Sequence, residues 1–155
     1  MQVPLCDNGM KVYFDEVLQY QDNADPNANP YAWSITTELV IPRGTKVLGI
    51  ECQDQGGSKG ILASTTDGQM TDESWSCSSN QNLRGWAEPG FTDTDGDFPT
   101  PSDLKLNEDG PGGLRPNISK DVRWIWGNKN SAFSVCRKKI GSIIILFGKV
   151  ERLPN

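Results

Sequence analysis

Hydrophobic and polar residues alternate over several short stretches of this chain, and this alternation predicts β-strands. Apolar residues occupy every second position from Met10 to Phe14, and after a slip the same face continues at Val17, so we predict one strand over residues 10–18. Three more strands are predicted over residues 33–41, 45–52 and 60–64. Because turn residues separate these strands, an antiparallel meander is expected.

The middle of the chain has a different pattern. Residues 65–118 are mostly polar, and they contain isolated large apolar residues, namely Trp75, Trp86, Phe91, Phe98 and Leu104. A long unstructured loop is uncommon in a compact domain, so we expect these side chains to hold the segment against the strands. Further strands are predicted over residues 124–126, 133–140 and 141–150, and no helical apolar stripe of eleven residues occurs. The pattern predicts an all-β fold, an antiparallel β-sandwich.

Length and composition indicate one domain over residues 1–155 and exclude several kinds of site. The chain has no histidine, which excludes a Ser-His-Asp triad, a Cys-His nucleophile and the usual zinc and copper sites. Its net charge of -5 argues against binding nucleic acid, which requires a basic surface. Glycine and proline, 16 and 10 residues, favour turns and short strands.

The four cysteines indicate disulfide bonds and therefore an extracellular protein. The four residues Cys6, Cys52, Cys77 and Cys136 are widely spaced. Because the chain contains no C-x-x-C pair, a zinc site or a thioredoxin-like site is not expected. Three pairings are open, and we favour Cys6–Cys52 with Cys77–Cys136 because each then joins two strand-like segments. The alternative is four reduced thiols in a cytosolic domain.

Neither a signal peptide nor a membrane span is expected from the sequence. The first six residues lack the basic and apolar regions of a signal peptide, as in a mature secreted protein. The longest apolar run, Ile-Ile-Ile-Leu-Phe at 143–147, is too short to cross a bilayer. It is interpreted as an inner strand or part of a subunit interface.

One acidic turn is a candidate metal site. Asp93, Asp95 and Asp97 alternate around Gly96, and carboxylates in a tight turn are typical ligands for calcium. The spacing is not that of an EF-hand, since no glutamate follows at the required distance. A solvated acidic turn is the alternative.

Tryptophan is abundant for so hydrophilic a chain, with five residues, and this favours carbohydrate binding. Indole faces stack on sugar rings while polar neighbours bind the hydroxyl groups. Trp75 and Trp86 lie in polar surroundings and are candidates for this role. Trp124 and Trp126 share one face of a predicted strand and are more typical of a core, and Trp33 is interpreted as structural.

Two other patterns carry less information. Asn117-Ile118-Ser119 is an N-glycosylation sequon, which agrees with a secretory protein. A glycosidase requires two carboxylates at a fixed separation, for which Glu51 and Asp54 are one candidate pair. Nothing in the sequence distinguishes that pair from others among the 20 acidic residues.

Several motifs together resemble galactose-binding-like β-sandwich modules of the invertebrate extracellular and lectin type. The segment Asp7-Asn8-x-x-Lys11-Val12-Tyr13-Phe14-Asp15 is similar to their D-N-x-x-x-x-Y-V-N-G strand, and 49–63 to A-I-E-x-x-D-x-G-G-x-x-G-L-I-A. Thr71-Asp72-x-x-Trp75, Gly85-Trp86, Phe91-Thr92-Asp93, Trp124-Ile125-Trp126 and Val135-Cys136-Arg137 follow in the same order as T-D-x-x-W, G-W, F-D-D, W-I-W and V-x-C-R. The chain departs from the pattern at Asp15-Glu16, which replaces an Asn-Gly turn, and at the acidic turn 93–97.

This resemblance implies a jelly-roll sugar-binding or accessory domain and no reaction of its own. We therefore expect a secreted lectin that is not an enzyme, requires no cofactor, accepts calcium optionally, and binds glycans or glycoproteins as a homo-oligomer with an even number of subunits. N-acetylglucosamine is the first expected sugar, before N-acetylgalactosamine. The alternatives are a structural or adhesive extracellular protein whose tryptophans are all in the core, and a carboxylate glycosidase. The expected ligand contacts are Trp75, Trp86, Asp93, Asp95, Asp97, Trp126 and Asn128.

Overall fold

The computed structural model describes residues 2–3, 6, 9–21, 37–54, 56, 59–102, 104–110, 113–115 and 118–141, and its regular structure is β apart from one 3₁₀ turn. The strands are β1 (Gln2–Val3), β2 (Met10–Phe14), β3 (Val17–Gln21), β4 (Thr37–Glu38), β5 (Val47–Gln53), β6 (Ser76–Ser78), β7 (Lys105–Leu106), β8 (Arg123–Trp124) and β9 (Phe133–Lys139), with the 3₁₀ turn η2 at Asn107–Asp109. The predicted all-β class is confirmed. Among the described residues, no helix has the length and apolar character needed to cross a membrane.

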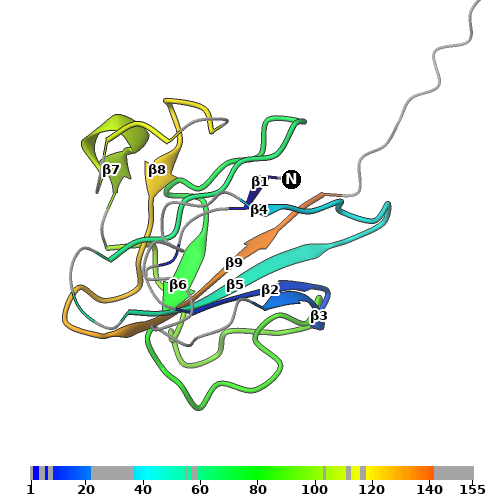
Figure 1. Ribbon diagram of the computed structural model, residues 1–155. Helices are drawn as coiled ribbons and strands as arrows, with labels where there is room; N and C mark the ends of the chain where they lie inside the picture. Colours follow the sequence, from blue (N-terminus) through cyan, green and yellow to red (C-terminus); the bar gives the residue numbers. More distant parts are fainter. Residues whose placement is uncertain are drawn as a thin grey trace, which may run out of the picture.

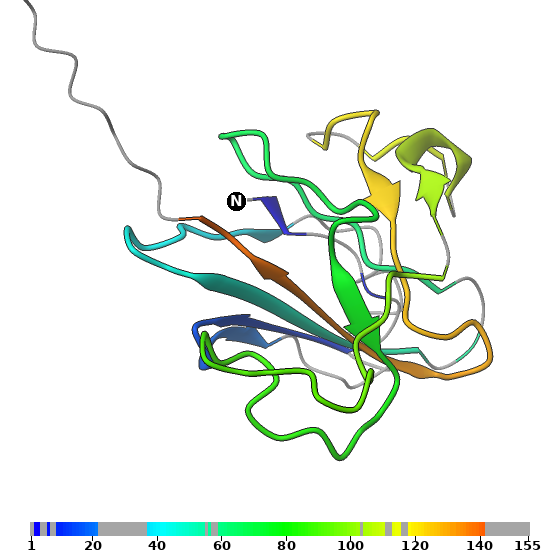
Figure 2. The same ribbon diagram turned by 180° about the vertical axis from the view of Figure 1, so that it is seen from behind.

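The central element is a five-stranded antiparallel sheet in the order β3-β2-β5-β9-β6 (Figure 1). Two small antiparallel pairs, β1–β4 and β7–β8, lie apart from it, and both are visible from behind in Figure 2. The predicted meander is wrong. β4, in the segment 33–41, pairs with β1 outside this sheet, and β5 lies between β2 and β9, which comes from the other end of the chain. This long-range pairing brings together segments that local patterns cannot relate.

The predicted strand over residues 10–18 is a hairpin in the structure. The alternation from Met10 to Phe14 is confirmed as the inner face of β2, but Asp15 and Glu16 form a two-residue turn with φ of 49° and 72°. Positive φ at both central residues is the signature of a type I′ turn, which usually contains Asn-Gly. The slip before Val17 is therefore the turn, and Val17 is 62% exposed on β3.

Strand β5 is buried on both faces because it lies at the centre of the sheet. Val47, Leu48, Gly49 and Ile50 are all buried. Leu48 and Ile50 belong to the main core, whereas a side chain at Gly49 would lie 2.8 Å from the ring of Trp86 on the other face. The glycine therefore allows the indole to pack directly on the strand.

Three buried clusters hold the layers together. The main cluster covers one face of the sheet and includes Ile61 and Ile125, which form an isolated antiparallel bridge opposite the sheet. A second cluster, Leu62, Ile118, Val122 and Trp124, lies beneath β7–β8. The third, Trp86, Ala87, Phe98, Phe133 and Val135, attaches the segment 79–98 to the opposite face. This arrangement agrees with a β-sandwich, and the jelly-roll arrangement stays a prediction.

Both disulfides involve the five-stranded sheet: one links Cys6 to β5, and the other links β6 to β9. The structure contains Cys6–Cys52 and Cys77–Cys136, the favoured pairing. Cys77 on β6 lies directly opposite Cys136 on β9. The linked residues are 46 and 59 positions apart in sequence, and loops of this length correspond to about 4 kcal/mol each in the chain-entropy model of disulfide stabilisation.

The other predicted strands are only partly formed. Residues 37–38 of the segment 33–41 are in β4, residues 60–64 contribute isolated bridges, and Phe133–Lys139 confirms the strand predicted over 133–140. Several features lie outside the described residues, namely Asp7, Asn8, Trp33, the sequon residue Asn117 and the apolar run 143–147.

Candidate functional site

A polar pocket with a volume of about 590 Å³ lies beside β6, at the loop between β8 and β9 and the segment that precedes β7. Three segments form its wall: the end of β6 with the residues after it, the turn and loop over 96–102, and the loop 127–129. Its lining residues are Cys77, Ser78, Ser79, Asn80, Gly96, Asp97, Pro99, Ser102, Gly127, Asn128 and Lys129. Asp97 and Asn128, 31 positions apart in sequence, are thus brought to one cavity.

Backbone hydrogen bonds fix the 96–102 segment between the other two walls. The N–H of Cys77 donates to the carbonyl of Pro99 at 3.0 Å, and the N–H of Ser102 donates to the carbonyl of Trp126 at 2.9 Å. The Ser102 hydroxyl lies 3.4 Å from the same carbonyl. Because these bonds join main-chain groups, the path of the 96–102 backbone does not depend on the side chains at the bonded positions.

Close backbone approach shapes the wall at Gly127. A Cβ added there would lie 3.0 Å from the Ser78 carbonyl carbon and 3.0 Å from Ser79 Oγ. The N–H of Gly127 donates to Ser134 Oγ at 3.0 Å, which ties this loop to β9. Ser79 Oγ is itself buried and has no hydrogen-bond partner among the described residues. A glycine at this position therefore keeps the cavity open beside a hydroxyl group.

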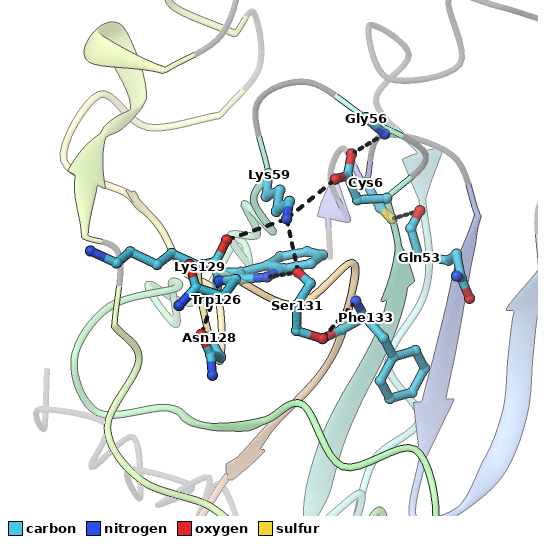
Figure 3. A network of polar contacts seen from close by, with 11 residues as sticks. Cys6, Gln53, Gly56, Lys59, Trp126, Asn128, Lys129, Ser131 and Phe133 are labelled. Carbon is cyan, nitrogen blue, oxygen red and sulfur yellow. Dashed lines mark hydrogen bonds and ion pairs between the residues drawn. The ribbon is translucent and has the colours of Figure 1, made fainter.

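A network of polar contacts stiffens the loop that carries Asn128 (Figure 3). Asn128 Oδ1 accepts a hydrogen bond from the N–H of Asn130 at 2.9 Å, and the indole N–H of Trp126 donates to the Ser131 carbonyl at 3.2 Å. Lys59 Nζ donates to the carbonyls of Lys129 and Ser131 at 3.3 and 3.1 Å. The Asn128 carboxamide is therefore held in one orientation while the residue stays exposed.

The carboxylate of Asp54 forms an ion pair with Lys59, which belongs to this network. The Asp54 side chain is 2% exposed, and its carboxylate lies 3.8 Å from Lys59 Nζ and accepts the N–H of Gly56 at 3.1 Å. A buried carboxylate needs such partners because its desolvation is costly. Lys59 thus connects a buried charge to the loop that borders the pocket.

The acidic turn is organised by Asp93 and presents Asp97. Both oxygens of Asp93 accept backbone hydrogen bonds, from the N–H of Asp97 at 2.8 Å and of Phe98 at 2.9 Å. Gly96 has φ of 71°, which permits the reversal. Asp97 is half-buried and faces the pocket, whereas Asp95 is exposed and does not line it.

The three aspartates do not form a metal site in the part of the chain that the structure describes, where no group of three or more acidic or cysteine side chains is placed to hold an ion. The physical reason is the turn itself, because Asp93 directs its carboxylate to the backbone amides. In this arrangement Asp93 is not directed at an ion, so calcium binding at the turn stays a prediction, and Asp97 is the carboxylate that lines the pocket.

The tryptophans predicted to stack on sugar are buried. Trp75 is 3%, Trp86 9% and Trp126 1% exposed. The indole N–H of Trp75 donates to the Met70 carbonyl at 2.9 Å, so both its apolar and polar parts are satisfied internally. Trp86 packs edge-on against Tyr13 at 5.4 Å between ring centroids. The prediction of exposed stacking faces is wrong for these residues, and no aromatic side chain belongs to the described pocket lining.

Arg137 attaches the segment 79–98, which leads to the pocket, to the sheet. Its side chain is largely buried, its Nη2 donates to the Glu88 carbonyl at 3.0 Å, and its guanidinium carbon lies 5.0 Å above the ring of Phe91. Burial lowers the pKa of Arg137, and the nearby negative charge of Asp93 opposes this effect. The acidic turn and the buried cation therefore stabilise each other electrostatically.

The two carboxylates of the candidate glycosidase pair, Glu51 and Asp54, each form an ion pair with a lysine. Glu51 Oε1 lies 2.7 Å from Lys11 Nζ, and this hydrogen bond raises the pKa of Lys11 against the opposing effect of burial. Asp54 is paired with Lys59, as described above. Neither carboxylate lines the polar pocket.

Sequence reasoning found Asp97 and Asn128 but missed Ser78, Ser79, Asn80, Ser102 and Lys129. The run Ser78-Ser79-Asn80 directly follows Cys77, and this position beside a disulfide-bonded cysteine is the sequence signal that could have indicated it.

Comparisons with models of protein families, with curated proteins and with solved structures find no match to this chain. The chemistry of the pocket is therefore the basis for a functional proposal.

Proposed function

We propose that this protein is a carbohydrate-binding protein that holds a terminal sugar in the polar pocket beside β6. The observation that carries the proposal is the meeting of Asp97 and Asn128, from two distant loops, around one cavity of about 590 Å³. That volume lies in the range of about 300–1,000 Å³ for small-molecule sites. Binding, with no reaction of the protein's own, is the proposed activity.

The side chains around the pocket match the needs of sugar hydroxyl groups. Each hydroxyl both donates and accepts, so a site needs carboxylates, amides and hydroxyls at short range. Asp97 supplies an acceptor, Asn80 and Asn128 supply amides, and Ser102 supplies a hydroxyl. Lys129 adds a cationic donor at the same wall. Hydrogen bonding thus replaces the indole stacking that the sequence suggested.

The proposed first ligand is N-acetylglucosamine, followed by N-acetylgalactosamine. The Asp97 carboxylate is suited to accept the acetamido N–H, and the Asn128 carboxamide is suited to a neighbouring hydroxyl. A small polar ligand buries little apolar area, so one site binds weakly. Avidity then requires several sites, and we propose a secreted homo-oligomer with an even number of subunits. The two disulfides agree with an oxidising compartment.

The test is a glycan-array screen with calcium and again with a chelator, followed by titration of the selected sugar. Asp97→Asn and Asn128→Ala are expected to weaken binding at least tenfold. Asp95→Asn is the matched control, because Asp95 lies in the same turn but outside the pocket. We expect binding to persist in chelator, since the Asp93 oxygens are already occupied by backbone amides. A blank array, or equal loss in the control, contradicts the proposal.

A structural or adhesive extracellular protein is the second candidate, and burial of the tryptophans favours it. Trp75, Trp86, Trp124 and Trp126 are all buried, as that alternative predicts. Tryptophan emission does not discriminate the two, because a sugar in the polar pocket would touch no described indole. Chemical-shift changes of the Asn80 and Asn128 side-chain amides on adding sugar would support the lectin. Their absence together with a blank array would support the structural protein.

A further inference from the structure

A second cavity lies at the opposite end of β9 and has a different chemical character. Its volume is about 640 Å³, and it is formed by the chain after β4, the turn over 65–69 and the last described residues after β9. The apolar part of its lining comprises Leu39, Val40, Ile41, Pro42, Leu48 and Ile140. We call this cavity the apolar groove.

The groove leaves hydrophobic surface without a described cover. Val40 is 89% exposed, while Leu39, Ile41 and Ile140 pack against the main core and are only partly buried. Leu48 at its floor is 1% exposed. Contiguous apolar surface of this kind usually marks a site where another element docks.

Two polar residues of the lining, Thr45 and Thr65, form hydrogen bonds within the protein, and the lining also contains Arg43 and Asp67. The hydroxyl and N–H of Thr45 bond the Pro42 carbonyl at 2.8 and 3.2 Å. Thr65 bonds the Gln69 backbone, with its N–H 2.7 Å from the Gln69 carbonyl. Two rigid turns therefore border an apolar floor, which fits an apolar segment better than a sugar.

The position of Gly141 identifies the occupant. Gly141 is both the last described residue and part of the groove's lining, and the chain's longest apolar run, Ile-Ile-Ile-Leu-Phe at 143–147, begins two residues later. Two residues span at most about 7 Å, so the run starts within reach of the groove. We propose that residues 143–147 dock into the apolar groove of their own chain.

The physical argument is proximity combined with burial of apolar area. A segment joined to the groove through a two-residue linker has an effective concentration on the order of millimolar or more. Burial of several large aliphatic side chains contributes favourably in proportion to the area removed from water.

The test compares three lengths of the protein: the full chain, a chain ending at Phe147 and a chain ending at Gly141. We expect the first two to behave alike. The shortest should bind a hydrophobic dye such as anilinonaphthalene sulfonate, should unfold several degrees lower, and should lose the dye when a synthetic peptide of residues 141–150 is added. Equal dye binding and equal unfolding temperature for all three would overturn the proposal.

Point variants keep the test valid if the shortest chain fails to fold. Ile145→Asp in the full chain should reproduce the dye binding, whereas Val150→Asp, in the same tail but outside the apolar run, should not. Val40→Ser in the groove should lower the unfolding temperature of the full chain, whereas Val17→Ser, an exposed valine on β3, should not. Identical results for each pair would contradict docking.

Oligomeric state distinguishes the remaining possibility. If the run instead docks into a second copy, the full chain should be a dimer whose unfolding temperature rises with protein concentration, and the chain ending at Gly141 should be a monomer. That outcome overturns docking within one chain. An association state that is the same for the full chain and for the chain ending at Gly141, together with the dye results, supports it.

Discussion

The carboxylate of Asp15 accepts the backbone N–H of Val47 at 2.8 Å, and the same oxygen accepts the N–H of Lys46 at 2.9 Å. A residue in the hairpin turn thereby fixes the start of β5. This relationship explains how Asp-Glu replaces the usual Asn-Gly at a turn with two positive φ angles, because the hydrogen bonds offset the conformational cost.

Asp15→Ala should lower the free energy of unfolding by about 1–2 kcal/mol, since two backbone amides lose a charged acceptor. Glu16→Gly should raise it by about 1 kcal/mol, because glycine adopts φ of 72° without strain. Urea unfolding with unchanged m-values is the measurement. Destabilisation by both substitutions would contradict this account of the turn.

Gly60 and Gly110 both lie against the ring of Trp124, and Gly110 offers a sharp test. A Cβ at Gly110 would lie 1.9 Å from Trp124 Nε1, whereas at Gly90 it would meet nothing within 4 Å. Gly110→Ala should therefore cost about 2–3 kcal/mol of stability through overpacking. Gly90→Ala is the matched control and should change stability by less than about 0.5 kcal/mol. Thermal and urea unfolding of both variants would show whether the cluster beneath β7–β8 can rearrange.

Glu16 provides a prediction for pH. Partial desolvation raises its pKa above the usual 4.5, and the charge of Glu88 and a hydrogen bond with it act in the same direction. The folded protein therefore binds this proton more tightly than the unfolded chain. The resulting contribution to stability is fully present below the usual pKa and is lost as the pH rises through the folded value.

Glu88→Gln should lower the pKa of Glu16 towards its usual value and should stabilise the protein more at neutral pH than at pH 4. Glu108→Gln, on η2, is a suitable control. Side-chain carboxyl titration by NMR measures the pKa directly. An unchanged Glu16 titration would show that Glu88 has no part in the shift.

Arg137 should be essential for attaching the segment 79–98 to the sheet. Arg137→Ala removes the hydrogen bond to Glu88 and the cation–π contact with Phe91, and should cost about 2 kcal/mol or more. Arg137→Lys should recover only part of this, because lysine lacks the planar donor group. Hydrogen exchange of the amides at 88–98 should increase in both variants. Unchanged exchange would mean that Trp86 and Phe98 suffice to hold the loop.

Local patterns predicted the parts of the fold that depend on neighbouring residues. The inner face of β2 follows from period-two alternation, whereas β5 and β9 begin with consecutive buried residues, as in short apolar runs of central strands. The alternation pattern ran through the turn at Asp15-Glu16, which only the family resemblance marked, because the groups that stabilise it, the N–H of Lys46 and of Val47, lie far along the chain. The pairing of β5 with β9 also depends on residues that sequence spacing cannot relate.

The candidate site was predictable only in part for the same reason. Asp97 and Asn128 were found because carboxylates and amides in polar loops are typical of ligand sites. The tryptophans were misplaced because a single indole in a polar segment has no local pattern that reveals a distant partner. Trp86, for example, packs against Tyr13 of β2, far away in sequence, and against Phe98 of its own segment.

The polar pocket is held by main-chain bonds, Cys77 to Pro99 and Ser102 to Trp126, and by the Cys77–Cys136 disulfide. The side chains of Asn80, Asn128 and Lys129 are exposed and contribute little to the free energy of folding. A lineage can therefore exchange them at small cost to stability. Such a scaffold is suited to acquiring new ligand preferences by point substitution while its sheet stays constant.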